Sequence, residues 1–265
     1  MKPFIKIFYC LCFSCLLFIK IQAQEISLPK DSIGRKTEAK SKINFLKFNI
    51  TGVALKNYTV QYERAFSRKF SFGLALRFMP NTSIPFKDKI IETIDVTDQD
   101  TKNTIEKLKI SGFGISPEIR LYLSKKGYGR GFYIAPYCRY ANFKIEDMQF
   151  TYENILNIKS TISLGGNFTN ITGGLQIGAQ WMLSKNLCLD WWIIGAHYGS
   201  GNGEFTGTSS KTLSPDEQAD LRSQLNDIDV PYSNKTVLVN ANGATIKLDG
   251  PWAGVKAGIA IGWRF

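Results

Sequence analysis

The 265-residue chain is poor in the residues that build metal sites and disulfide frameworks. It has one histidine, His197, and five cysteines, three of which fall within the first 15 residues. Only Cys138 and Cys188 remain beyond that segment. They fall on stretches that we predict to be non-neighbouring strands, so we interpret both as free thiols. Nothing in the sequence resembles a closed zinc site or a phosphate-binding loop. The sequence therefore predicts no metal and no cofactor.

Long apolar runs are also scarce. The one exception begins with Lys2 and Lys6, continues over residues 7–19 and ends near Ala23, which is typical of a cleavable signal peptide at residues 1–23. A membrane anchor is the alternative interpretation. Residues 24–42 are polar and lack periodicity, and we expect a flexible periplasmic segment. Because no later run approaches a transmembrane helix in length, the rest of the chain could cross a membrane only as a closed β-barrel.

From residue 43 onward the chain repeatedly alternates between large apolar residues and small or polar ones. This period of two is expected for strands with one apolar face. In the final stretch every second residue from Ala253 to Phe265 is apolar, and the residues between them are small or cationic. Eight such stretches occur, at residues 44–51, 58–65, 70–78, 112–123, 132–140, 171–181, 187–198 and 253–265.

The connections between these stretches sort by length. Tight turns follow the second, fourth and sixth stretches, and long loops follow the third, fifth and seventh, at residues 79–109, 144–166 and 199–249. Short turns on one rim and long loops on the other are typical of outer-membrane barrels. We therefore predict an all-β fold over residues 43–265, an eight-stranded antiparallel up-and-down transmembrane β-barrel with long outer loops.

The last long loop contains a helix-start pattern. Ser214 suits an N-cap, Pro215 suits the first helical position and Glu217 completes a capping box. Leu221 and Leu225 then fall on one helical face. The pattern predicts one short helix, which is either a lid over the barrel mouth or a surface for a partner.

The small or polar face of the predicted strands carries nearly all of their charges. An Arg or Lys that faces the middle of a bilayer costs about 2–4 kcal/mol, so we expect the charged face to point into the barrel. Eight strands leave an interior just wide enough to be filled by side chains, which favours an internal ion-pair network; a narrow gated channel is the alternative. The predicted network is Glu63, Arg77, Glu118, Arg120, Arg139, Asp190, Lys256 and Arg264.

The formal net charge of +11 predicts an anionic partner. An exported protein rarely meets nucleic acid, so we expect phosphate-bearing lipid headgroups and no nucleic-acid partner.

The end of the chain resembles the C-terminal signature of Gram-negative outer-membrane barrels, through Ile259, Ile261, Trp263 and Phe265. In that class the barrel-assembly machinery recognises this signature. The segment NFLKFNITGVALKNYTVQYERAFSRKFSFGLALRFMP also resembles the start of an uncharacterised family of small outer-membrane barrels, with an OmpA/OmpX-like architecture. The resemblance implies a bacterial outer-membrane location. The partners implied are outer-membrane lipid including lipopolysaccharide, the assembly machinery and, in some cases, another envelope protein.

One constellation suggests chemistry, in the stretch GAHYGSGNGEF with His197, Ser200 and Glu204. Outer-membrane lipid A deacylases use a His-Ser-Glu set on the lipid side, with His and Ser two residues apart. Here the spacing is three, which places His197 and Ser200 on opposite faces of a regular strand. We therefore predict a non-enzymatic envelope protein with a structural or surface-interaction role. The lipid-modifying enzyme remains an alternative, as does a secreted lipocalin-type barrel with its apolar residues inside.

Overall fold

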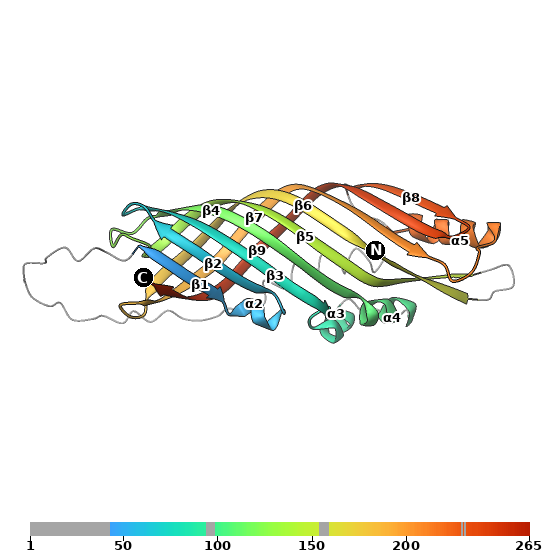
Figure 1. The fold of residues 1–265 in the computed structure, drawn as a ribbon, viewed down its shortest axis with the longest axis horizontal. Coiled ribbons are helices and arrows are strands. Elements are labelled where there is room, and N and C mark those ends of the chain that lie inside the picture. The colour runs from blue at the N-terminus through green and yellow to red at the C-terminus, as the bar shows by residue number, and fades with distance from the viewer. Residues whose placement is uncertain (1–42, 94–98, 154–158, 229, 231) are drawn as a thin grey trace, which may run out of the picture.

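The computed structural model describes residues 43–93, 99–153, 159–228, 230 and 232–265. The predicted signal peptide and the predicted periplasmic segment lie outside these residues. The described strands form one antiparallel sheet in the order β1-β2-β3-β4-β5-β6-β7-β9-β8. Because β1 also pairs with β9, eight of them close into a ring (Figure 1). The predicted all-β, up-and-down barrel topology is thereby confirmed.

The elements have the following bounds. The strands are β1 Asn44–Asn49, β2 Tyr58–Ala65, β3 Phe70–Ser83, β4 Lys109–Tyr122, β5 Gly131–Glu153, β6 Lys159–Met182, β7 Leu187–Thr208, β8 Asn234–Asn240 and β9 Gly243–Arg264. The helices are α2 Thr51–Ala54, α3 Lys87–Thr93, α4 Gln99–Lys107 and α5 Pro215–Asn226. Within the described part of the chain, no helix has the length and hydropathy that a membrane crossing requires.

Side chains alternate between the two sides of the ring, except where a bulge shifts the register. On β2, Gln61 and Glu63 are buried in the interior, whereas their neighbours Val60 and Tyr62 are exposed on the outside. The closing strand β9 follows the same rule, with Ala260 buried. The outside of the ring is therefore apolar and its interior contains the polar residues, which is the reverse of a water-soluble barrel.

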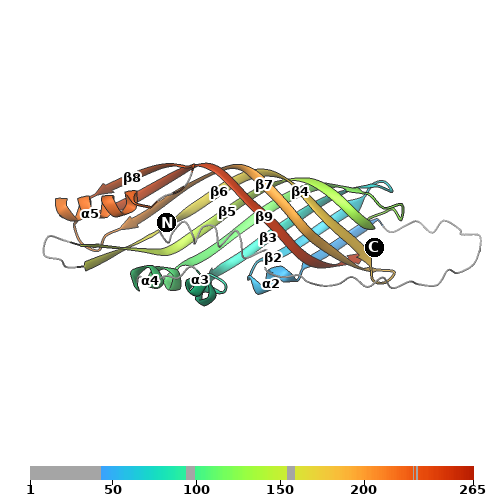
Figure 2. The same ribbon diagram turned by 180° about the vertical axis from the view of Figure 1, so that it is seen from behind.

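The prediction of loops at residues 144–166 and 199–249 is wrong, because most of these residues form strands or the helix α5. β5, β6, β7 and β9 continue past the ring, and β8 adds a ninth strand that pairs with β9 (Figures 1 and 2). We call this part the sheet extension: β8 with residues 147–153, 159–168, 201–208 and 243–250. These strands form because their alternate residues are apolar and pack together, as Ile162 and Leu164 do on β6.

The predicted helix, α5, packs against the sheet extension. Ser214 and Glu217 form the capping box expected from the sequence. Leu221 and Leu225, both fully buried, join a core supplied by the strands, which includes Phe150, Tyr152, Ile162, Leu164, Phe205, Val239 and Ile246. The sheet extension therefore has its own hydrophobic core, separate from the ring, on the side that continues the barrel interior.

The polar connection at residues 79–109 is also more ordered than predicted, because it contains α3 and α4. The Thr104 hydroxyl in α4 donates a hydrogen bond to the Gln149 carbonyl of β5, 3.0 Å away. Ile105 in the same helix is buried. A further short helix, α2, fills the β1–β2 connection. The prediction of a single helix is therefore wrong.

Candidate functional site

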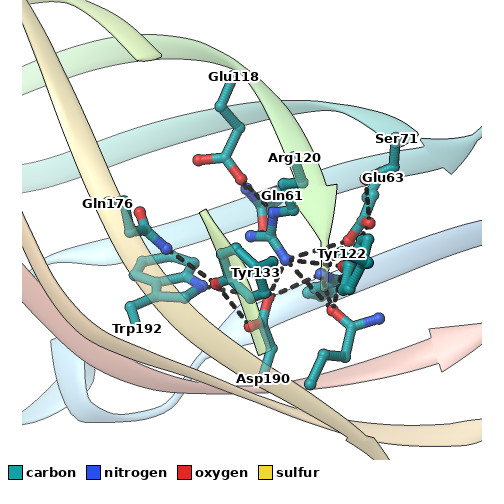
Figure 3. Close-up of polar contacts among 12 residues, drawn as sticks. Gln61, Glu63, Ser71, Glu118, Arg120, Tyr122, Tyr133, Gln176, Asp190 and Trp192 are labelled. Carbon is teal, nitrogen blue, oxygen red and sulfur yellow. Dashed lines mark hydrogen bonds and ion pairs between the residues drawn. The ribbon is translucent and has the colours of Figure 1, made fainter. Parts of the chain in front are cut away.

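A buried ion-pair network occupies the ring interior on the side of the short turns. Its charged members come from β1, β2, β4, β7 and β9, so only closure of the ring brings them together. Figure 3 shows Glu63, Glu118, Arg120 and Asp190 pointing toward one another. Each points inward because it lies at an inward position of its strand. Lys47, Glu63, Arg120 and Asp190 have no side-chain exposure at all.

Asp190 accepts hydrogen bonds from four neighbours. The Lys47 ammonium and one terminal nitrogen of Arg120 each donate to Asp190 Oδ2 over 2.7 Å. The Tyr133 hydroxyl donates to Oδ1 over 2.9 Å, and the Trp192 indole N–H donates to Oδ2 over 3.2 Å. Four donors on one carboxylate satisfy its acceptor capacity and stabilise its charge in the absence of water.

Arg120 is the largest fully buried side chain and links the carboxylates. Its Nε donates to Glu118, and its terminal nitrogens reach Glu63 Oε2 at 3.2 Å and Gln61 Oε1 at 2.9 Å. Its guanidinium carbon lies 4.2 Å from the centre of the Tyr133 ring. A planar guanidinium with several donors suits this bridging position better than a lysine would.

Glu63 completes the network on the β1–β2 side. It pairs with Lys47 and accepts a hydrogen bond from the Tyr122 hydroxyl at 2.7 Å. On the β9 side, the Lys256 ammonium lies 3.3 Å from Glu118 Oε2. Three carboxylates therefore meet three cations: Glu63, Glu118 and Asp190 against Lys47, Arg120 and Lys256.

Five of the eight residues predicted for this network meet in the contacts described above. Glu63, Glu118, Arg120, Asp190 and Lys256 meet as described. Arg77, Arg139 and Arg264 lie at other places around the interior.

The three outlying arginines have separate surroundings. The Arg77 guanidinium carbon lies 4.9 Å from the centre of the Phe143 ring, and that of Arg264 lies 5.6 Å from the Phe45 ring centre. Arg139 pairs in register with Thr172 of β6.

Sequence reasoning missed several members of the network. Lys47 lies on the polar side of the first predicted strand, so its inward direction could be read from the alternation. Its partners could not, because they are 16 and 143 residues away along the chain. The uncharged members were also missed: Gln61, Ser71, Tyr122, Tyr133, Gln176, Gln180 and Trp192.

The predicted position of His197 at a strand end is wrong. β7 runs on to Thr208, and a bulge between Trp192 and Gly195 shifts the alternation by one residue. His197 therefore faces the interior, where its Nδ1 lies 3.0 Å from the Tyr137 hydroxyl. Ser200 and Glu204 are exposed on the opposite face.

The arrangement is suited to filling space and holding charge. Side chains with no exposure occupy the interior at the level of Arg120 and Asp190. No group of three or more candidate metal ligands occurs among the described residues. Cys138 is exposed and Cys188 is buried, and both are free thiols as predicted.

Comparison with known protein families matches residues 10–203 to the model of a family described as "Protein of unknown function (DUF3575)". A comparison with curated proteins gives no match.

Proposed function

The chain belongs to this DUF3575 family, and from its own residues we propose that it is a non-enzymatic outer-membrane β-barrel protein of OmpA/OmpX-like architecture with a structural or surface-interaction role. The ring would anchor the protein in the bilayer. The sheet extension would stand outside the membrane and offer a folded surface. The observation that carries the proposal is the sharp boundary between an uncharged and a polar zone on the outside of the strands.

The uncharged zone covers the outward positions of the ring between the short turns and the sheet extension. On β3, Phe72, Leu76 and Phe78 are between 42% and 59% exposed. On β6 and β9, Leu175 and Trp263 are each 54% exposed. A contiguous apolar surface of this kind marks a contact with lipid or protein, and a belt around a closed barrel suits lipid.

The polar zone runs without a break across five adjacent strands. One row of cross-strand neighbours consists of Asn142, Thr169, Asn202, Asp249 and Asn234. The next row outward consists of Lys144, Asn167, Glu204, Lys247 and Thr236. A change from apolar to polar outward residues on neighbouring strands is expected where the strands leave a bilayer and enter water.

The inward charges support the same arrangement. If the sidedness were reversed, Arg120 and Lys256 would face lipid at about 2–4 kcal/mol each near the midplane. Instead they are paired with carboxylates inside the ring. The filled interior favours a closed anchor over a conducting channel. Because His197 and Ser200 face opposite sides, the geometry offers no converging pair for a lipid-modifying enzyme.

The proposal is tested by fractionation with heat-modifiability. The full chain is expressed in a Gram-negative host, outer membranes are isolated, and boiled and unboiled samples are compared on a denaturing gel. We expect the protein in the outer-membrane fraction, with a mobility that shifts on boiling. A soluble protein without a shift would overturn the membrane assignment, and the apolar outside of the ring would then need another partner.

A further inference from the structure

The three short turns at one rim of the ring carry cationic side chains and no acidic side chain. The three turns are residues 66–69, 123–130 and 183–186, and none contains an acidic residue. Their cations are Arg68, Lys69, Lys125, Lys126, Arg130 and Lys185. The opposite end carries both signs, as in α5, where the acidic residues Asp216, Glu217 and Asp220 accompany Arg222. The turn rim therefore has a net attraction for anions that the other end lacks.

A cavity of about 630 Å³ opens at this rim beside the β4–β5 turn. Leu123, Phe132 and Trp181 form its apolar side, and they are 58%, 56% and 39% exposed. Lys126 and Arg130 lie on its polar side. The cavity thus joins a cationic rim to the apolar outside of the ring.

Two hydrogen-bond donors at this cavity have no acceptor among the described residues. They are Arg130 Nε and Gln180 Nε2, and both atoms are buried. Gln180 has no exposure, and its amide oxygen is held by the Lys47 ammonium in the ion-pair network. Its amide nitrogen cannot turn away without breaking that contact. A buried donor without an acceptor costs about 1–3 kcal/mol, so the interior next to this cavity is not fully hydrogen-bonded.

We propose that this cavity binds the phosphate headgroup of an anionic phospholipid, with an acyl chain lying along Leu123, Phe132 and Trp181. The proposal rests on the proposed membrane location and deepens it. The Lys126 ammonium and the Arg130 guanidinium, which line the cavity, would donate to the phosphate oxygens and balance their charge. A lipid is favoured over a free anion because the site continues directly into an apolar surface, which only an amphiphile would cover.

The test is native mass spectrometry of the full-length protein in detergent micelles. Equal amounts of phosphatidylglycerol and phosphatidylcholine are added, and the bound lipids are counted. We expect preferential retention of phosphatidylglycerol. Arg130→Gln and Lys126→Gln should each lower that retention roughly fivefold, as expected for one cation at a lipid surface. Lys185→Gln is the matched control, because it removes a cation of the same rim that does not line the cavity.

Two further arms identify the ligand. Inorganic phosphate at millimolar concentration should leave phosphatidylglycerol bound; displacement by phosphate alone would show a simple anion site. Purified lipopolysaccharide should bind these variants no less well than the parent protein. A loss of lipopolysaccharide binding in Arg130→Gln would assign the site to glycolipid and overturn the phospholipid assignment.

Failure of this inference is distinguishable from failure of the membrane proposal. Each variant is first tested for the boiling-dependent gel shift. Equal retention of the two phospholipids by a protein that shows the shift would refute the headgroup site and leave the barrel intact. A parent protein that shows no shift would refute the membrane proposal itself.

Discussion

Removing one charge from the buried network should cost far more stability than removing a charge from the surface of the same strand. Asp190→Asn keeps the shape of the side chain, and its carbonyl oxygen at the Oδ1 position can still accept from Tyr133, whereas the amide nitrogen at the other position faces the donors Lys47, Arg120 and Trp192. It leaves three cations facing two carboxylates, with Lys47 and Arg120 fully buried. Breaking a buried ion pair by removing one partner costs about 3–5 kcal/mol, and we expect a loss of that size.

A second substitution should restore much of the balance. Lys47→Met removes a buried cation of similar length, so the double variant leaves Glu63 and Glu118 facing Arg120 and Lys256. The loss in the double variant should therefore be smaller than the sum of the two single losses by about 2 kcal/mol, within the range seen for directly coupled residues. Additive losses would mean that the two side chains do not share one network.

The assay is urea unfolding of the barrel refolded into phospholipid vesicles, followed by tryptophan fluorescence and by the gel shift. Glu204→Gln is the matched control, since it removes an exposed acid of β7 whose Lys247 partner lies 3.6 Å away. That change should stay within about 0.5 kcal/mol. An Asp190→Asn variant that lost less than about 1 kcal/mol would refute the reasoning.

Three further outcomes are expected. Leu225→Ala should cost about 2–5 kcal/mol in the core of the sheet extension, so protease cleavage there should rise while the gel shift persists; loss of the shift would show that extension and ring do not fold separately. The hydrogen bond from the Lys211 ammonium lowers the pKa of the Glu217 carboxyl below its usual range. The stabilisation of α5 by this contact is therefore present above the unfolded-state pKa and lost as the pH falls through the lower folded-state pKa; hydrogen exchange should show this loss, and Glu217→Gln should remove it. Phe265→Ala should lower the amount of assembled barrel severalfold in isolated outer membranes, whereas Phe66→Ala, at an exposed turn position, should not; equal amounts would count against an assembly signal.

Much of the ring could be predicted from the sequence, because each strand crosses between an apolar outside and a polar interior. The residues of β2 and β9 alternate so regularly that position along the strand decides direction, as for Glu63 and Lys256. The shifts from this rule are local. The bulge after Trp192 reverses the direction of His197. The residues there are apolar on both faces, so the sequence does not show where the bulge inserts its additional residue.

The sheet extension was less accessible to sequence reasoning. Its inward side is apolar and its outward side is polar, so polarity along the chain resembles that of a loop, as in residues 159–168. β8 is a strand because β9 provides its pairing partner and α5 covers it, and both lie elsewhere in the sequence. The partners within the ion-pair network depend on closure between β1 and β9, which the alternation of single strands does not contain.

Cys138 offers the most direct test of the central claim, that the outside of the ring faces lipid. It is a free, exposed thiol on the outward face of β5, two residues from Tyr140 at the upper edge of the uncharged zone. A nitroxide attached there in vesicles can be probed by oxygen, which enters lipid, and by a water-soluble nickel chelate, which does not; Cys138→Ser identifies the signal. We predict strong relaxation by oxygen and little by nickel. Strong relaxation by nickel and little by oxygen at Cys138, equal to the relaxation of a label at Asn202→Cys in the polar zone, would contradict a membrane-spanning barrel.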